Sequence, residues 1–174
     1  MNSNNEKVVF VPSCLLCPLL MAKKASQDQP WRHLIISYLN EQGYSIMQMP
    51  CPEASFPSYD CGIKRSSHGI KYYENLAGFR NHCHELGSQV LSQIDAFYSN
   101  GYKVHAILGI EHSPTCAASY MYTHNGTQNR QGIFIQYLAY RINERGYSIP
   151  IIGINRTYPQ KAIRTLILNN KEHE

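Results

Sequence analysis

The chain has 174 residues, of which 43% are hydrophobic and 16% are charged, and its formal net charge at pH 7 is +4. This length and composition predict one globular domain spanning residues 1–174. The small charge and the scattered lysines and arginines do not indicate nucleic acid as a partner, and no apolar run is long enough to cross a bilayer. The polar first seven residues lack the apolar segment of a signal peptide, which predicts a cytoplasmic protein.

The six cysteines need an explanation in a cytoplasmic chain. A reducing compartment disfavours disulfides, so metal binding, catalysis and plain burial are the interpretations to weigh. The positions of the cysteines relative to the expected strands decide among them.

Strands and helices are expected to alternate along the chain. In order, the expected elements are a strand at 7–11, a helix from Pro30 to about residue 42, a strand at 44–49, a long helix over 72–99, a strand at 103–108, a helix from Ile133 to about residue 145, a strand at 147–154 and a short helix at 159–169. The first strand is nearly continuous in apolar residues, as in a parallel strand buried on both faces. Asp28 is a candidate cap for the first helix.

Three glycines mark the joints between a helix and the next strand. Residues 40–46 and 143–149 share the pattern Asn-Glu-X-Gly-Tyr-Ser-Ile, and we expect Gly43, Gly101 and Gly146 in the left-handed conformation that ends a helix. These joints are short, whereas the loops that leave the strands are long. The alternation predicts an α/β domain with a small, mostly parallel, Rossmann-like sheet, helices on both faces, and long loops at the carboxyl ends of the strands.

A proline and a cysteine follow three of the expected strands. These cysteines are Cys14, Cys51 and Cys116. Because the carboxyl ends of parallel strands lie at one edge of a sheet, where ligands bind, we expect the three thiols to meet there.

Three converging thiolates suit a soft metal centre. A [4Fe–4S] cluster normally takes four cysteines, so three would leave one iron open to a substrate atom. A mononuclear zinc site with an open position is the alternative. Zinc sites more often contain close cysteine pairs, and the chain has one Cys-X-X-Cys pair, Cys14 with Cys17. Scattered cysteines at strand ends therefore favour a cluster.

Three motifs resemble those of the thiouracil desulfidase (TudS) family, in order and over nearly the whole chain. They are Ser13-Cys14-Leu15-Leu16, Cys51-Pro52-Glu53 and Ser113-Pro114-Thr115-Cys116, which are similar to the family's SxCLLG, CPE and SPSC motifs. The chain departs from the family pattern at Cys17 and Ala117, which stand in place of glycine, and it has Ala22-Lys23-Lys24 in the region of the family's Tyr-Asp-Gly segment.

The resemblance implies a cofactor, a set of site residues and a reaction. It implies that Cys14, Cys51 and Cys116 bind a [4Fe–4S] cluster, that Glu53 is the catalytic acid or base, and that Ser113 assists in the active site. The implied substrate is a thiolated pyrimidine such as 2-thiouracil or a related small thiocarbonyl compound, in which water replaces sulfur. The alternative is a non-enzymatic iron–sulfur or zinc module with a redox-sensing or structural role, for which Cys17 would supply a fourth ligand.

Most of the remaining cysteine, polar and aromatic residues are expected to have structural rather than catalytic roles. Cys83 lies on the apolar stripe of the long helix and is expected to be buried, and Cys17 and Cys61 are expected to be ordinary thiols. The residues expected on the surface or in supporting roles are His82, His84, Glu111, His112, Arg130, Arg141, Arg145, Arg156 and Arg164. Tyr120 and Tyr122 are candidates for stacking on a pyrimidine ring.

Overall fold

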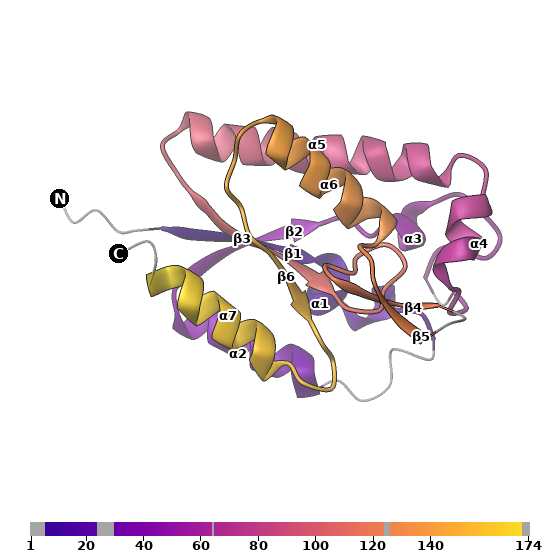
Figure 1. Ribbon diagram of the computed structural model, residues 1–174, viewed down its shortest axis with the longest axis horizontal. Coiled ribbons are helices and arrows are strands. Elements are labelled where there is room, and N and C mark those ends of the chain that lie inside the picture. The colour runs from indigo at the N-terminus through magenta and orange to yellow at the C-terminus, as the bar shows by residue number, and fades with distance from the viewer. Residues whose placement is uncertain (1–5, 24–29, 64, 124–125, 172–174) are drawn as a thin grey trace.

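A parallel sheet of four strands forms the centre of the computed structural model, which describes residues 6–23, 30–63, 65–123 and 126–171 (Figure 1). The strands lie in the order β2 (Tyr44–Met49), β1 (Lys7–Pro12), β3 (Val104–Ile110) and β6 (Ile151–Ile154). Every neighbouring pair is parallel, from Lys7 beside Tyr44 to Ile110 beside Ile154. The candidate cap Asp28 lies outside the described residues.

Two helices cover each face of the sheet, as the sequence predicted. Helices α5 (Phe79–Ser99) and α6 (Ile133–Glu144) lie on one face, and α2 (Pro30–Glu41) and α7 (Gln160–Lys171) lie on the other (Figure 1). No helix among the described residues is long and apolar enough to cross a membrane.

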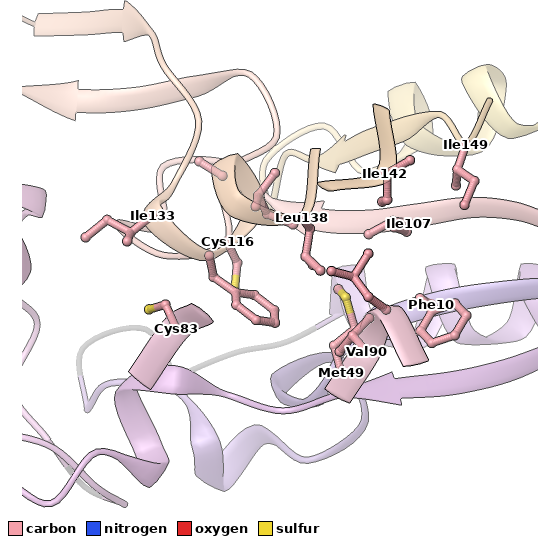
Figure 2. Packing of buried hydrophobic residues seen from close by; sticks show 14 of the residues in the cluster. Phe10, Met49, Cys83, Val90, Ile107, Cys116, Ile133, Leu138, Ile142 and Ile149 are labelled. Atoms are coloured by element: carbon pink, nitrogen blue, oxygen red, sulfur yellow. The ribbon is translucent and has the colours of Figure 1, made fainter. Parts of the chain in front are cut away.

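The central strand β1 packs against both layers of helices. Val8 and Phe10 belong to the cluster beneath α5 and α6, whereas Val9 and Val11 belong to the cluster beneath α2 and α7. Figure 2 shows Phe10 in the first of these clusters, near residues of α5 and β3. All four side chains are at most 1% exposed, which explains the unbroken apolar run of this strand.

Two of the expected elements are wrong in extent. The predicted helix over 72–99 is two helices, α4 (Ile70–Asn75) and α5, because the chain turns at Gly78, whose φ is 80°. The fourth strand occupies only the last four of the residues predicted for it, 147–154. The first part of the predicted strand does not pair with the sheet. The Tyr147 amide donates to the Ile142 carbonyl at the end of α6, and Pro150 has no N–H to donate to a neighbouring strand.

The long loops contain short elements that the sequence analysis did not predict. Helix α1 (Ser13–Leu16) and the 3₁₀ turn η1 (Pro18–Leu20) follow β1, and α3 (Pro52–Ser55) follows β2. Strands β4 (Tyr120–Thr123) and β5 (Gly126–Asn129) form an antiparallel pair after β3. The helix-ending glycines are confirmed: φ is 69° at Gly43, 80° at Gly101 and 71° at Gly146.

The strand order fixes where a ligand site is expected. The chain runs from β1 outward to β2 and then returns across β1 to β3. The connections leaving β1 and β3 therefore diverge, which opens a crevice at the carboxyl ends of these strands. The loops that follow β1, β2 and β3 all begin at this edge of the sheet.

Candidate functional site

The three cysteines that follow β1, β2 and β3 line one cavity at the carboxyl edge of the sheet. Cys14 lies in α1, Cys51 immediately precedes α3, and Cys116 lies in the loop after β3. The cavity has a volume of about 100 Å³, which is the space of several water molecules. The structure therefore brings together three thiols that are far apart in the sequence.

Local backbone structure places Cys51 and Cys116. Pro52 begins α3, where its missing N–H costs nothing, and the Ser55 hydroxyl donates to the Cys51 carbonyl at 3.0 Å. The Cys116 amide donates to Ser113 Oγ at 3.1 Å, and the Cys116 carbonyl accepts from the Ile110 amide at 2.9 Å. Each thiol is thus carried by a backbone segment that has its own hydrogen bonds.

Two glycines allow the loop of Cys116 to pack directly on neighbouring backbone. A Cβ atom at Gly132 would lie 2.6 Å from the Cys116 nitrogen and closer still to the Thr115 carbonyl group. A Cβ atom at Gly109 would meet the Cys116 carbonyl oxygen and lie 3.3 Å from the Ala118 nitrogen. Glycine is needed at both positions because the approach leaves no room for a side chain.

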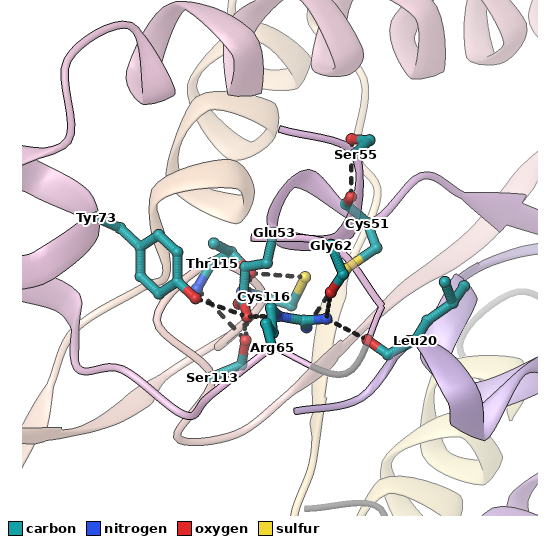
Figure 3. A network of polar contacts seen from close by, with 10 residues as sticks. All are labelled: Leu20, Cys51, Glu53, Ser55, Gly62, Arg65, Tyr73, Ser113, Thr115 and Cys116. Atoms are coloured by element: carbon teal, nitrogen blue, oxygen red, sulfur yellow. Dashed lines mark hydrogen bonds and ion pairs between the residues drawn. The ribbon is translucent and has the colours of Figure 1, made fainter. Parts of the chain in front are cut away.

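Glu53 lies in the cavity wall and is bound by three side chains (Figure 3). Arg65 Nε donates to its Oε2 at 2.9 Å, and the Tyr73 hydroxyl donates to the same oxygen at 3.3 Å. Thr115 Oγ1 donates to the other oxygen, Oε1, at 2.7 Å. Glu53 and Arg65 are only 6% and 7% exposed, so the carboxylate is a buried charge with a complete set of partners.

Arg65 joins two of the cysteine-bearing loops. Its Nη1 donates to the Leu20 carbonyl at 2.7 Å and to the Gly62 carbonyl at 3.2 Å, and its Nη2 lies 3.7 Å from Cys51 Sγ (Figure 3). A guanidinium offers five donors in a fixed plane, which is why one side chain can make all these contacts. The sulfur of Cys51 therefore lies beside a buried cation.

Ser113 and Thr115 form a chain of hydroxyl groups that ends at Glu53. Ser113 Oγ accepts from the Thr115 and Cys116 amides at 3.4 and 3.1 Å, and it lies 3.3 Å from Thr115 Oγ1. A threonine hydroxyl has one proton, and its shortest contact here is with Glu53. The proton between the two hydroxyls therefore comes from Ser113.

The three thiols affect one another's ionisation. Burial, followed by the neighbouring Cys51 and Glu53, raises the pKa of Cys14 to about 12. Burial, followed by the charges of Cys51 and Cys14, raises the pKa of Cys116 well above its ordinary value of 9.0. Burial followed by Glu53 also raises the pKa of Cys51. Thiols of this kind lose their protons at neutral pH only when a strong Lewis acid, such as a metal centre, binds the sulfur.

The three thiols are soft donors of the kind that an iron–sulfur cluster takes. Within the described ranges, no three His, Cys, Asp or Glu side chains have the spacing needed to hold one metal ion together. In a cluster each cysteine binds a different iron, so the sulfur atoms lie farther apart than the ligands of one zinc ion. The three thiols come from three different loops around one cavity.

Two histidines and an arginine also line the cavity. His112 has a φ of 67°, and its ring stacks on Tyr122 with centroids 3.8 Å apart. His68 stacks on Tyr72 at 3.9 Å. Arg156 follows β6, and its side chain is exposed at the cavity wall rather than on a distant solvated face. Neither His112 nor Arg156 was assigned to the site from the sequence.

The other residues singled out in the sequence are not among the described residues that line the cavity. Cys83 is buried in the core, as predicted, and Cys17 is half-buried and is not among the described residues that line the cavity. Glu111 has a supporting role, since it accepts from the Ser119 and Tyr120 amides. The other expected supporting contacts are His82 with Ser55, His84 with Tyr137, Arg130 with Glu74, Arg141 with Glu144 and Arg145 with Asp95.

Comparison with known proteins gives one structural relationship. No protein-family profile matches the chain, and no curated protein matches it in sequence. A solved structure described as a [4Fe-4S]-dependent thiouracil desulfidase TudS (DUF523) aligns with a TM-score of 0.52 and 15% sequence identity, covering 94% of this chain and 99% of that one. This likeness supports the α/β fold, in which a parallel sheet is flanked by helices.

Proposed function

We propose that this protein is an iron–sulfur-dependent desulfidase that acts on a thiolated pyrimidine or a related small thiocarbonyl compound. The observation that carries the proposal is the convergence of Cys14, Cys51 and Cys116 on a cavity that also contains a buried carboxylate. The fold likeness to a protein described as a [4Fe-4S]-dependent desulfidase gives independent support. We further propose that the chain forms one such domain and works in the cytoplasm, where its thiols would stay reduced.

Cys14, Cys51 and Cys116 would hold a [4Fe–4S] cluster. When bound, such a cluster supplies an iron without a protein ligand, a soft Lewis acid suited to a thiocarbonyl sulfur. The chain contributes the surroundings. Burial of Cys116 excludes water from its sulfur, and the Arg65 guanidinium offsets negative charge beside Cys51.

The reaction needs a group that accepts a proton from water. Overall, the thiocarbonyl carbon and one water give a carbonyl and hydrogen sulfide, so the carbon–sulfur bond breaks, a carbon–oxygen bond forms, and no electrons are gained or lost. Glu53 is the base of the proposed mechanism. A water bound beside Thr115 would pass a proton to Thr115 Oγ1, which donates its own proton to Glu53 Oε1, while Ser113 Oγ holds Thr115 Oγ1 by a hydrogen bond. The protonated Glu53 would return the proton to the departing sulfur, which leaves as hydrogen sulfide.

The same contacts favour a second candidate function. Glu53 is tied to Arg65, Tyr73 and Thr115, which is also the arrangement of a carboxylate that only fixes loops. The protein would then be a non-enzymatic iron–sulfur or zinc module with a redox-sensing or structural role. In that case Cys17 would close the open iron position.

The deciding experiment is anaerobic reconstitution with iron and sulfide, followed by Mössbauer spectroscopy with and without 2-thiouracil. A desulfidase should show one iron subsite that changes on addition of the thiolated base, and it should release sulfide. Cys51→Ala should lose both the cluster and the activity, whereas Glu53→Gln should keep iron and lose sulfide release. A closed cluster with no spectral response and no sulfide would favour the second function.

A further inference from the structure

Glu111, the residue that follows β3, is a buried carboxylate without a cation. Its side chain is 5% exposed, and none of the ion pairs among the described residues involves it. Glu53, by contrast, is paired with Arg65. Burying an unpaired carboxylate is costly unless hydrogen bonds compensate for the lost water. The contacts of Glu111 therefore show what this position does in the fold.

The Glu111 side chain joins the hairpin of β4 and β5 to β6. Its Oε2 accepts hydrogen bonds from the Ser119 and Tyr120 amides, at 3.1 and 2.9 Å. On the side of β6, the Glu111 amide donates to the Ile154 carbonyl at 3.0 Å. A Cβ atom at Gly153 would lie 2.7 Å from Glu111 Cγ and closer still to the carboxylate, so only glycine leaves room for this side chain.

The next residue, His112, lies in the cavity wall and depends on the same hairpin. Its φ is 67°, a conformation that a residue other than glycine keeps only when surrounding contacts hold it. The His112 amide donates to the Tyr120 carbonyl at 2.8 Å, and the His112 ring stacks on Tyr122 with centroids 3.8 Å apart. Tyr120 is therefore bonded through its N–H to Glu111 and through its carbonyl to His112.

We propose, on the basis of the proposed function, that Glu111 is a positioning residue for the desulfidase reaction and acts through His112. By fixing the start of β4, the Glu111 carboxylate places Tyr122 against the His112 ring, and this stack holds the ring in the cavity wall. Glu111 itself is not among the described residues that line the cavity. A displacement of about 1 Å in a site can lower a rate by about 10²-fold. Loss of Glu111 should therefore slow the reaction while the three cysteines and Glu53 stay unchanged.

The placement of His112 can be tested on the apoprotein, without any assay of activity. Diethyl pyrocarbonate modifies accessible imidazoles, mass spectrometry resolves each histidine, and the exposed His33 is an internal reference. In Glu111→Ala, His112 should be modified about tenfold faster, the factor that corresponds to the loss of one aromatic stack. Tyr122→Ala removes a ring that is 62% exposed and should give the same acceleration. Modification of His112 at the wild-type rate overturns the inference, and Tyr122→Ala decides the question if Glu111→Ala does not fold.

The kinetic test measures sulfide release from 2-thiouracil by the reconstituted protein, at a temperature at which every variant is folded. Glu111→Ala should keep its iron and lose about tenfold to a hundredfold in kcat/KM. Glu111→Gln should recover most of that loss, because its carbonyl oxygen can still accept both amides. Combining Glu111→Ala with Tyr122→Ala should cost no more than either change alone, since both break the same stack. Additive losses, or full activity in Glu111→Ala, overturn the inference.

Asp95→Ala is the matched control. Asp95 is also a carboxylate that accepts hydrogen bonds from another segment, from the Tyr147 hydroxyl at 2.9 Å and from Arg145 Nε at 3.2 Å, but it lies near the C-terminal end of α5. Its removal should lower stability and leave both His112 modification and kcat/KM unchanged. A loss of kcat/KM equal to that of Glu111→Ala would reflect general loosening of the fold and overturns the inference. If the wild type releases no sulfide while Glu111→Ala exposes His112, the proposed function fails and the placement of His112 by Glu111 stands.

Discussion

Gly132→Ala tests whether close backbone packing sets the position of Cys116. The added Cβ would lie 2.6 Å from the Cys116 nitrogen and closer still to the Thr115 carbonyl group, whereas ordinary contacts begin at 3.4 Å, so the loop must retreat by at least about 0.8 Å. Functional sites tolerate displacements of only about 0.5 Å. The variant should therefore retain substoichiometric iron after anaerobic reconstitution and repurification, even though no ligand has been changed.

The same crowding has a cost in stability that can be measured separately. Overpacking costs about 1–3 kcal/mol, and for a chain of this size each kcal/mol lowers Tm by about 2–4 °C. The apoprotein of Gly132→Ala should thus melt about 2–12 °C below the wild type when followed by circular dichroism.

Gly87→Ala separates loss of iron from loss of stability. Its Cβ would lie 2.7 Å from a ring carbon of Tyr137 at the contact of α5 with α6, away from the cysteine-bearing loops. That variant is also crowded, but it should bind iron like the wild type. If Gly132→Ala and Gly87→Ala load iron equally well, the packing of Gly132 does not position Cys116 and the reasoning fails.

Three further predictions concern the polar network and the thiols. Thr115→Val removes the hydroxyl between Ser113 and Glu53, so sulfide release should fall by about 10²-fold or more and Thr115→Ser should restore it; an undiminished rate in the valine variant rules out the proton path. Arg65→Met leaves the buried Glu53 unpaired and should lower the free energy of unfolding in urea by about 3–5 kcal/mol, while adding Glu53→Gln should recover most of that loss; no recovery would show that the charge pair is not the cause. In the apoprotein the Cys14 thiol, with its pKa of about 12, should be alkylated by iodoacetamide at a rate that still rises above about pH 10.5, where the rate of an ordinary thiol with a pKa of 9.0 has levelled off; a plateau by about pH 10.5 contradicts the effect of burial.

The positions of the thiols could be predicted from the sequence because they follow from topology. Strands buried on both faces read as continuous apolar runs, as in residues 7–11, and parallel strands end at one edge. A cysteine placed just after each of three such strands must therefore lie near the others. The structure adds that β1 and β3 flank the point where the chain reverses direction across the sheet.

The partners of Glu53 could not be predicted, because they depend on contacts between distant segments. Arg65 lies in a polar loop where an arginine is normally solvated, and Tyr73 lies in an amphipathic helix like many other tyrosines. Their roles arise only when α3, the following loop and α4 pack together. Arg156 is exposed, so its sequence context resembles that of a surface residue.

The short elements were missed for a different physical reason. Helices of four residues such as α1 and α3 complete a single turn and carry no periodic pattern. The residues of β5, Gly126–Asn129, are all exposed, so no alternation of apolar and polar side chains marks the hairpin. The break before α5 was hidden because apolar spacing continues across Gly78, although its left-handed backbone ends the helical path.

The contacts of Arg65 connect the loops that carry the three cysteines. One guanidinium reaches the Leu20 carbonyl, the Cys51 sulfur and the Glu53 carboxylate, and Glu53 in turn holds Thr115 beside Cys116. Three loops are therefore cross-linked by one buried ion pair. If the proposed cluster binds there, these contacts would lower the entropy cost of ordering the loops around it. The same contacts would keep the loops in place for a new cluster after the first had been lost to oxygen.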